Sequence, residues 1–353
     1  MSKYIFDKIH ESASLQDPMY TSDDHARWLV RKDQADIDIM SDAEVKFILL
    51  GVNKLVATIK YENENYFCFS GLGEAVNLPA NLEEIESTPG LFACVIYCAQ
   101  LKSFATASQA RDALEQQYRG VDEYSGHALE QIEDLFQKLY FAKANIDASS
   151  TYLNNLDRVA GAYIASQYLS HPLEINYNLR SRLITFFEAG DETIPFNLPL
   201  QGILSYNWPS LFLDLYRCLE QLYTVIKLKS LVEKLPYNGA LAELAYLLED
   251  QLSWRPKEQD ALASILSSSN EATRSKVISA FNPDTQSGME YSASKCAAHI
   301  YKLRNSHVHF RPAMKAETRS TEQWNEIVIA MCDMVDEVYE ALGNEFLKNR
   351  VSS

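Results

Sequence analysis

Four polar side chains that can do chemistry fall within six positions of the chain. They are Arg304, Asn305, His307 and His309. An imidazole, with a reference pKa of about 6.5, can give or take a proton at neutral pH. A guanidinium offers planar, permanently charged hydrogen-bond donors that suit an oxyanion such as a phosphate. This short cluster is therefore suited to proton transfer beside a bound anion.

An apolar helical pattern leads into the cluster. Its members recur at steps of three and four and predict one buried helix face: Ala293, Cys296, Ala297, Ile300 and Leu303. The next positions on that face are Arg304 and His307. A guanidinium at a core position is costly unless it is paired, so Arg304 is expected to have a specific partner.

The order Arg304-Asn305, three further residues and His309 resembles the Arg-(Asn/Asp/His)-x-x-x-His signature of HEPN domains. These helical domains occur in many prokaryotic RNA-cleaving toxins and defence proteins. The resemblance covers roughly residues 205–350. It implies an RNA endonuclease that acts as a homodimer, serving as a toxin or antiviral effector. It assigns the acid–base role to His309, the phosphate contact to Arg304 and a positioning role to Asn305.

RNA cleavage without a metal fits these residue types. The reaction must remove a proton from the 2′-OH, protonate the leaving 5′ oxygen and stabilise a dianionic phosphorane. Histidine can serve either proton transfer and arginine can bind the phosphorane oxygens. Because no carboxylate cluster of the kind that holds Mg²⁺ accompanies the motif, we expect no metal and no cofactor.

Further residues are expected to support this site. Glu220, on a stripe beside the core seam of an earlier helix, is the expected partner of Arg304, and Tyr216 lies one turn from it; a solvated Glu and a core aromatic are the alternatives. His307 can assist the catalytic residues, but the sequence favours a polar residue at the helix surface. Contacts to the RNA backbone are expected from three basic residues: Lys302, Arg311 and Lys315. Some HEPN proteins carry, at the position of Arg311, a Tyr that a partner nucleotidyltransferase modifies. Control by this modification is therefore not expected here.

Two other interpretations compete with catalysis. Cys296 and His299, together with His307 and His309, supply four potential zinc ligands, but their spacing does not match a standard zinc knuckle. The alternative function is a non-catalytic HEPN-type binding or scaffold protein that keeps the motif for structural reasons.

The overall plan is mainly α. An N-terminal α+β domain, residues 1–125, is expected to sense or regulate, through a partner or a trigger. Residues 126–200 are predicted to be a helical connecting region. Residues 201–353 are predicted to form an up-and-down helical bundle of the HEPN type.

Secondary-structure patterns support this plan. Strands are predicted at 45–50, 55–61 and 66–69, and helices at 105–118, 127–144, 152–169 and 173–188, with a linker at 191–200. One long helix is predicted over 211–235, followed by helices at 240–252, 259–266 and 271–281. A capping box, Ser320 with Gln323, is expected to start a last helix that buries one apolar face: Trp324, Ile327, Met331, Val335, Val338 and Leu342.

Composition and charge limit the partners and the cellular compartment that we expect for this protein. The formal net charge of −16 argues against broad nucleic-acid binding. The segment 291–320, with six basic residues and the single acid Glu317, is net +5 and can steer a phosphate backbone to one place. No apolar run is long enough to span a bilayer, and six scattered cysteines are typical of reduced core thiols. We therefore expect a cytoplasmic protein without membrane contact.

Overall fold

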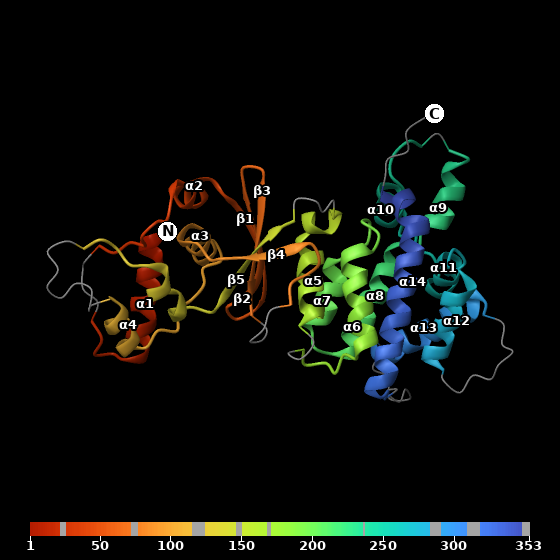
Figure 1. The fold of residues 1–353 in the computed structure, drawn as a ribbon. Helices are drawn as coiled ribbons and strands as arrows, with labels where there is room; N and C mark the ends of the chain where they lie inside the picture. The colour runs from red at the N-terminus through yellow and green to blue at the C-terminus, as the bar shows by residue number, and fades with distance from the viewer. Residues whose placement is uncertain are drawn as a thin grey trace. The chain divides into compact units, whose positions relative to one another are not determined.

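The computed structural model, drawn in Figure 1, divides the chain into two compact units, residues 1–160 and 161–353. It describes the chain except for nine segments: 22–25, 72–76, 115–123, 146–149, 168–170, 236, 283–290, 309–317 and 348–353. The fold is mainly α, as predicted. The three segments expected from the sequence differ from these two units, because the region 126–200 is shared between them.

Unit 1 contains an antiparallel sheet of five strands in the order β1-β2-β3-β5-β4. The three strands that the sequence predicted are present, and the two tight turns between them use left-handed backbone at Asn53 and Glu62. The strands are β1 (Glu44–Gly51), β2 (Lys54–Tyr61), β3 (Glu64–Ser70), β4 (Leu82–Ile85) and β5 (Leu139–Ala144).

The helix predicted over 127–144 is wrong. This segment forms two short 3-10 turns, Leu129–Gln131 and Glu133–Leu135, and then β5. β5 pairs with β3 on one side and with β4 on the other, so its backbone groups are satisfied by strands that lie far away in the sequence. This long-range pairing overrides the local helical pattern.

Four helices lie on one side of the sheet in Figure 1 and close the core of unit 1. The first was not predicted, although Ile5, Phe6, Ile9 and Ala13 line its buried face. The helices are α1 (Ser2–Gln16), α2 (Gln34–Asp42), α3 (Pro89–Cys98) and α4 (Ala107–Leu114). A third 3-10 turn, Thr151–Asn154, follows the sheet.

Unit 2 is a helical bundle. The helices α6 and α7 lie in the region that the sequence predicted to be a connecting segment. They belong to unit 2 because α6 packs on α14 and α7 packs on α8. The helices are α5 (Leu156–Ser166), which begins before the division, α6 (Tyr177–Ala189), α7 (Asn197–Leu204), α8 (Trp208–Gln221), α9 (Val225–Val232), α10 (Leu241–Leu252), α11 (Glu258–Leu266), α12 (Glu271–Phe281), α13 (Ala293–Val308) and α14 (Thr321–Leu347).

The central element of unit 2 is α14, which packs against α6, α8 and α12. Its predicted apolar face is buried along its whole length. The predicted capping box is also present: the Gln323 amide N–H donates to Ser320 Oγ at 3.3 Å, and the Ser320 N–H donates to Gln323 Oε1 at 3.1 Å. Two orphan donors at the helix start are thereby satisfied.

Two predictions in this unit need correction. The single helix expected over 211–235 is interrupted at residues 222–224 and forms α8 and α9. Thr224, Val225 and Ile226 are β-branched, which lowers the local helix propensity at the interruption. The linker expected over 191–200 contains the start of α7, where Pro199 falls in the first turn and costs no intrahelical hydrogen bond.

None of the described helices combines the length and the apolar character that a membrane span requires. All six cysteines are free thiols, and five of them are buried.

Candidate functional site at the junction of three helices

The helix α13 carries Arg304 to the position that the sequence predicted. Cys296, Ala297, Ile300 and Leu303 form its buried face. Arg304 follows directly on that face, and its side chain is only 15% exposed. The predicted cost of placing a guanidinium there is met by partners from two other helices.

Two carboxylates and one amide surround the Arg304 guanidinium. Nη2 lies 4.0 Å from Glu220 Oε1 on α8, which is the partner that the sequence predicted. Nη1 lies 3.5 Å from Glu258 Oε2, at the first position of α11, and donates to Asn305 Oδ1 at 3.0 Å. The guanidinium therefore donates one hydrogen bond, to Asn305, and lies within ion-pair distance of two carboxylates.

Aromatic rings complete the surroundings of Arg304. The guanidinium carbon lies 5.6 Å from the centre of the Tyr216 ring and 6.0 Å from that of Tyr301. The buried Tyr223 hydroxyl donates to the Tyr216 hydroxyl at 2.7 Å. These rings limit water access on one side of the guanidinium and add a cation–π attraction.

The electrostatics of the site are uneven. Burial raises the pKa of Glu220; Arg304 opposes that shift, and the nearby Glu258 carboxylate adds to it. Burial also raises the pKa of Tyr216 to about 12. Glu220 lies at the last turn of α8, where the helix dipole disfavours a negative charge, whereas Glu258 lies at the first turn of α11, where the dipole favours one.

His307 and Lys302 occupy different surroundings on α13. His307 is half-buried, and its ring centre lies 5.7 Å from the indole of Trp324 on α14, so it is not the open surface residue that the sequence favoured. Lys302 is exposed. Both residues share the last two turns of α13 with Arg304.

Three predicted site residues, His309, Arg311 and Lys315, lie outside the described residues. Arg304 lies beside Asn305, Glu220 and the ring of Tyr216. Tyr216 is a buried core aromatic, which is the alternative considered for it above, and its hydroxyl accepts from Tyr223. Within the part of the chain that the structure describes, no group of three or more His, Cys, Asp or Glu residues is arranged to hold a metal ion. Cys296, considered above as a zinc ligand, packs in the buried seam of α13.

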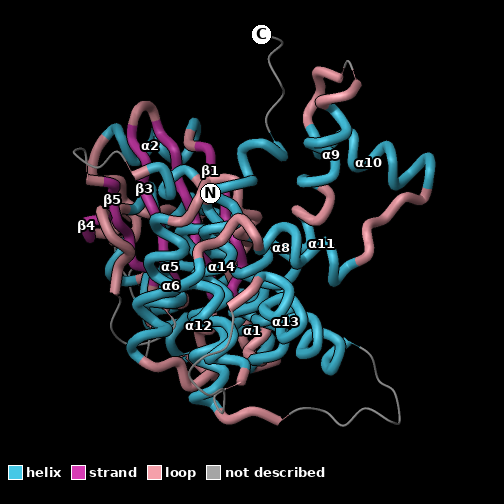
Figure 2. The backbone as a smooth tube through the Cα atoms, turned by 90° about the vertical axis from the view of Figure 1, so that its right-hand side faces the viewer, coloured by secondary structure: helices cyan, strands magenta, loops and turns pink. Residues whose placement is uncertain are grey.

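Sequence reasoning missed Glu258, Tyr301 and the hydroxyl contact of Tyr223. Tyr223 shares the stripe of Tyr216 and Glu220, so its helical spacing was a usable signal. Glu258 has none, because its approach to Arg304 depends on how α11 packs against α8 and α13. Figure 2 shows these three helices in the tube view.

No protein-family model matches the chain, and neither a curated protein nor a solved structure is significantly similar to it.

Proposed function

We propose that this protein is a cytoplasmic, metal-independent RNA endonuclease of the HEPN type, whose site is centred on Arg304. The observation that carries the proposal is a half-buried guanidinium, held at the junction of α8, α11 and α13, next to Asn305 and five residues before His309 in the sequence. A rigidly held arginine is suited to bind the charge that develops on a phosphorane.

In this mechanism the RNA 2′-OH attacks the adjacent phosphorus. His309 transfers protons, Arg304 donates hydrogen bonds to the non-bridging oxygens and Asn305 fixes the guanidinium plane through its Oδ1 contact. The products are a 2′,3′-cyclic phosphate or 3′-phosphate and a 5′-hydroxyl. DNA lacks the nucleophile and should not be cut.

The two carboxylates beside Arg304 have different roles in this proposal. Because burial raises the pKa of Glu220, this side chain holds a proton more readily than an ordinary glutamate and can share the proton transfers. Glu258 neutralises Arg304 when no phosphate is bound. Substrate phosphate must therefore compete with Glu258 for the same guanidinium.

We further propose that two copies of the chain form the active species. The α9–α10 hairpin exposes several large apolar side chains, and a cavity of about 590 Å³ between these helices is lined mainly by Leu228, Leu231, Leu248, Leu252 and Trp254. Exposed apolar surface of this kind marks association sites. A two-fold dimer would also supply two Arg304 and two His309 residues for the two proton transfers.

Unit 1 is proposed to sense a trigger or partner and to restrain unit 2, so that the protein acts as a toxin or antiviral effector only when released. Comparing the full chain with a chain that begins near Asn155, so that α5 and the rest of unit 2 stay whole, tests this restraint. Equal RNase activity and equal effects on cell growth would refute it.

The central experiment combines purified protein, labelled RNA and excess EDTA with end-group analysis of the products. Arg304→Ala and His309→Ala are each expected to lower the rate about 10²- to 10³-fold. Lys295→Ala is the matched control, because Lys295 is an exposed cation on the same helix. Cleavage that requires a metal, or that persists in His309→Ala, would overturn the proposal.

One observation favours a second candidate, a non-catalytic binding or scaffold protein. Arg304 is already neutralised by two carboxylates and packed on Tyr216, as in a purely structural network. If this candidate is right, the purified wild type cuts no RNA and Arg304→Ala lowers stability only. Expression that stops growth in the wild type but not in His309→Ala would favour the nuclease.

A further inference from the structure

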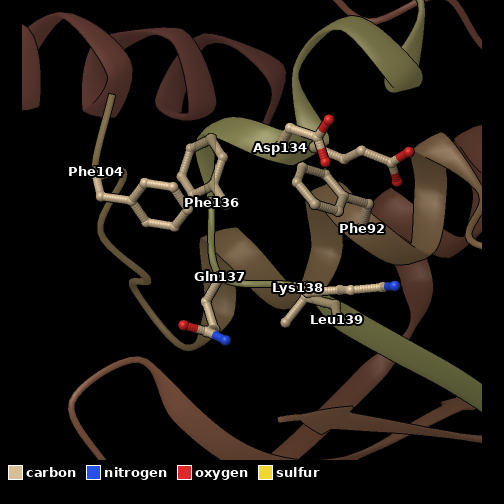
Figure 3. A pocket seen from close by; sticks show the side chains of 8 residues that line it. Phe92, Phe104, Asp134, Phe136, Gln137, Lys138 and Leu139 are labelled. Atoms are coloured by element: carbon tan, nitrogen blue, oxygen red, sulfur yellow. The ribbon is translucent and has the colours of Figure 1, made fainter. Parts of the chain in front are cut away.

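A cavity of about 450 Å³ lies in unit 1, beside the 3-10 turns that precede β5. Figure 3 shows its walls. The residues that matter here are three aromatic side chains, Phe92, Phe104 and Phe136, and three polar ones, Glu133, Asp134 and Gln137. This combination of rings and carboxylates restricts the chemistry of a ligand more than either part alone.

The aromatic wall is fixed by packing and by the backbone. The rings of Phe92 and Phe136 are buried and pack edge to face, with centroids 5.8 Å apart. Phe104 is 47% exposed, yet its backbone N–H donates to the Leu135 carbonyl at 3.1 Å. The protein therefore holds an aromatic face open at the cavity, at the cost of leaving apolar surface in water.

Two neighbouring carboxylates face this wall. Among the described residues, neither Glu133 nor Asp134 accepts a side-chain hydrogen bond or forms an ion pair. Burial raises the pKa of Glu133, and the charges of Asp134 and Glu130 add to that shift. The carboxylate of Glu133 is thus partly removed from water and lacks a hydrogen-bonded cation to compensate.

Among the described residues that line the cavity, the two carboxylates outnumber the one lysine, Lys138. Lys138 Nζ lies 5.0 Å from the ring centre of Tyr140, and its charge, with that of Lys32, only partly offsets the raised pKa of Glu133. In Figure 3 the Asp134 carboxylate lies at the top of the cavity and the Gln137 amide at its base, with the rings of Phe104 and Phe136 at the left. A ligand that carries phosphate would meet two like charges here.

We propose that this cavity binds an organic cation with a flat apolar body, of the amidinium or guanidinium class. The planar N–H donors would bond to Glu133 and Asp134, and the apolar body would lie against Phe104. Such a group can come from a free small molecule or from an arginine side chain of a peptide. The two sources share the same chemistry and are separated by the probes below.

The test is calorimetric titration of the full chain with benzamidine, a flat aromatic amidinium, and with benzamide, its neutral isostere. N-acetylarginine amide and an arginine-containing peptide represent the peptide source. Benzamidine is expected to bind and benzamide is not. Tighter binding of the arginine peptide than of benzamidine would assign the site to a protein partner, and the reverse order to a small molecule.

Matched variants locate the binding. Glu133→Gln is expected to weaken benzamidine binding by about 10- to 100-fold, because a charged hydrogen bond is lost. Phe104→Leu retains apolar contact but removes the ring, and should weaken it less. Glu130→Gln is the control, because Glu130 belongs to the preceding 3-10 turn and does not line the cavity. Each variant is first compared with the wild type by thermal unfolding.

The proposal is wrong if benzamide binds as tightly as benzamidine, since the cavity would then select apolar shape alone. It is also wrong if millimolar benzamidine gives no heat with the wild type, or if Glu133→Gln and Glu130→Gln bind it equally well.

Discussion

Arg304 and Glu258 meet across the junction of α13 and α11, with Nη1 3.5 Å from Oε2. Glu258 is the first residue of α11, where the helix dipole favours a negative charge, and its side chain is about as accessible to solvent as that of Glu220. In the proposed nuclease this contact occupies the guanidinium that the substrate phosphate needs. The strength of RNA binding should therefore depend on the charge at position 258.

Glu258→Gln is expected to strengthen RNA binding by several-fold, because the competing charge is removed while the side-chain volume is kept. Anisotropy of labelled RNA measures the affinity. Glu249→Gln is the control, since Glu249 pairs with Arg255 in an exposed glutamate–arginine ion pair and does not contact Arg304. The stability change should be small for Glu249→Gln, at about 0–1 kcal/mol, because that pair is solvent-screened, and larger for Glu258→Gln, because the Arg304 side chain is only 15% exposed. Unchanged RNA affinity in Glu258→Gln would contradict the competition.

Arg304→Lys is expected to lose nearly as much RNase activity as Arg304→Ala, about 10²-fold or more. The separate Nη1 and Nη2 atoms of Arg304 approach Glu258 and Glu220, and a single ammonium nitrogen cannot reproduce both approaches together with the hydrogen bond to Asn305. Single-turnover cleavage rates give the comparison. His307→Ala, which removes a ring packed on Trp324, should cost far less than His309→Ala. A fully active Arg304→Lys would mean that only charge matters at this position.

The pH dependence of stability should report Asp336 on α14. Burial raises the pKa of Asp336 to about 6, against the lowering effect of Arg182, which also pairs with Asp333. The folded state therefore holds this proton more tightly than the unfolded chain, whose aspartates titrate at about 4. As pH rises from 4 to 6, the contribution of Asp336 to the free energy of unfolding falls.

Asp336→Asn is expected to remove that decline, which amounts to roughly 1–3 kcal/mol across the window. Urea unfolding at pH 4, 5, 6 and 7 measures the slope, and the difference between the two proteins isolates Asp336 from other titrating groups. Asp336→Asn also removes one of the two ion-pair partners of Arg182, so the variant is expected to be less stable overall. The comparison therefore uses the pH slope and not the absolute free energy of unfolding. Parallel curves for the two proteins would show that the Asp336 pKa is not raised.

Self-association should respond to the apolar surface of the α9–α10 hairpin. Leu252 is 69% exposed and borders the cavity there, so Leu252→Glu is expected to shift a dimer towards monomer and to lower RNase activity with it. Light scattering gives the mass. Leu15→Glu, at a leucine on α1 that is 80% exposed, serves as the control. A monomeric wild type that cuts RNA at the same concentration would exclude the dimer proposal.

The accuracy of the sequence-based predictions follows the range of the interactions involved. The strands β1 to β3, the helix α12 and the capping box at Ser320 are decided by neighbouring residues, and all are present. β5 was predicted as a helix because its two pairing partners lie far away in the sequence. The unit boundary was missed for a related reason, since the packing of α6 and α7 cannot be read from local patterns.

The same distinction applies to the candidate site. Helical spacing places Arg304 at the edge of a buried face and Glu220 and Tyr216 on one stripe, so their meeting was predictable. The approach of Glu258 depends on the packing of three helices. The chemical roles of Arg304, Asn305 and His309 stay predictions, because they rest on the resemblance to HEPN domains.

The interruption between α8 and α9, at residues 222–224, limits which substitutions are acceptable at Thr224. In an unbroken helix, Tyr216 and Tyr223 would stand seven residues and about 10 Å apart along the axis. The turn at 222–224 shortens that separation along the chain's course, and the Tyr223 hydroxyl donates to the Tyr216 hydroxyl at 2.7 Å, next to the ring over which Arg304 lies. Replacing Thr224 by a strong helix former would favour the straight form and draw the two hydroxyls apart. A segment of low helix propensity is therefore expected to help keep the tyrosine pair, and with it the aromatic support of the guanidinium.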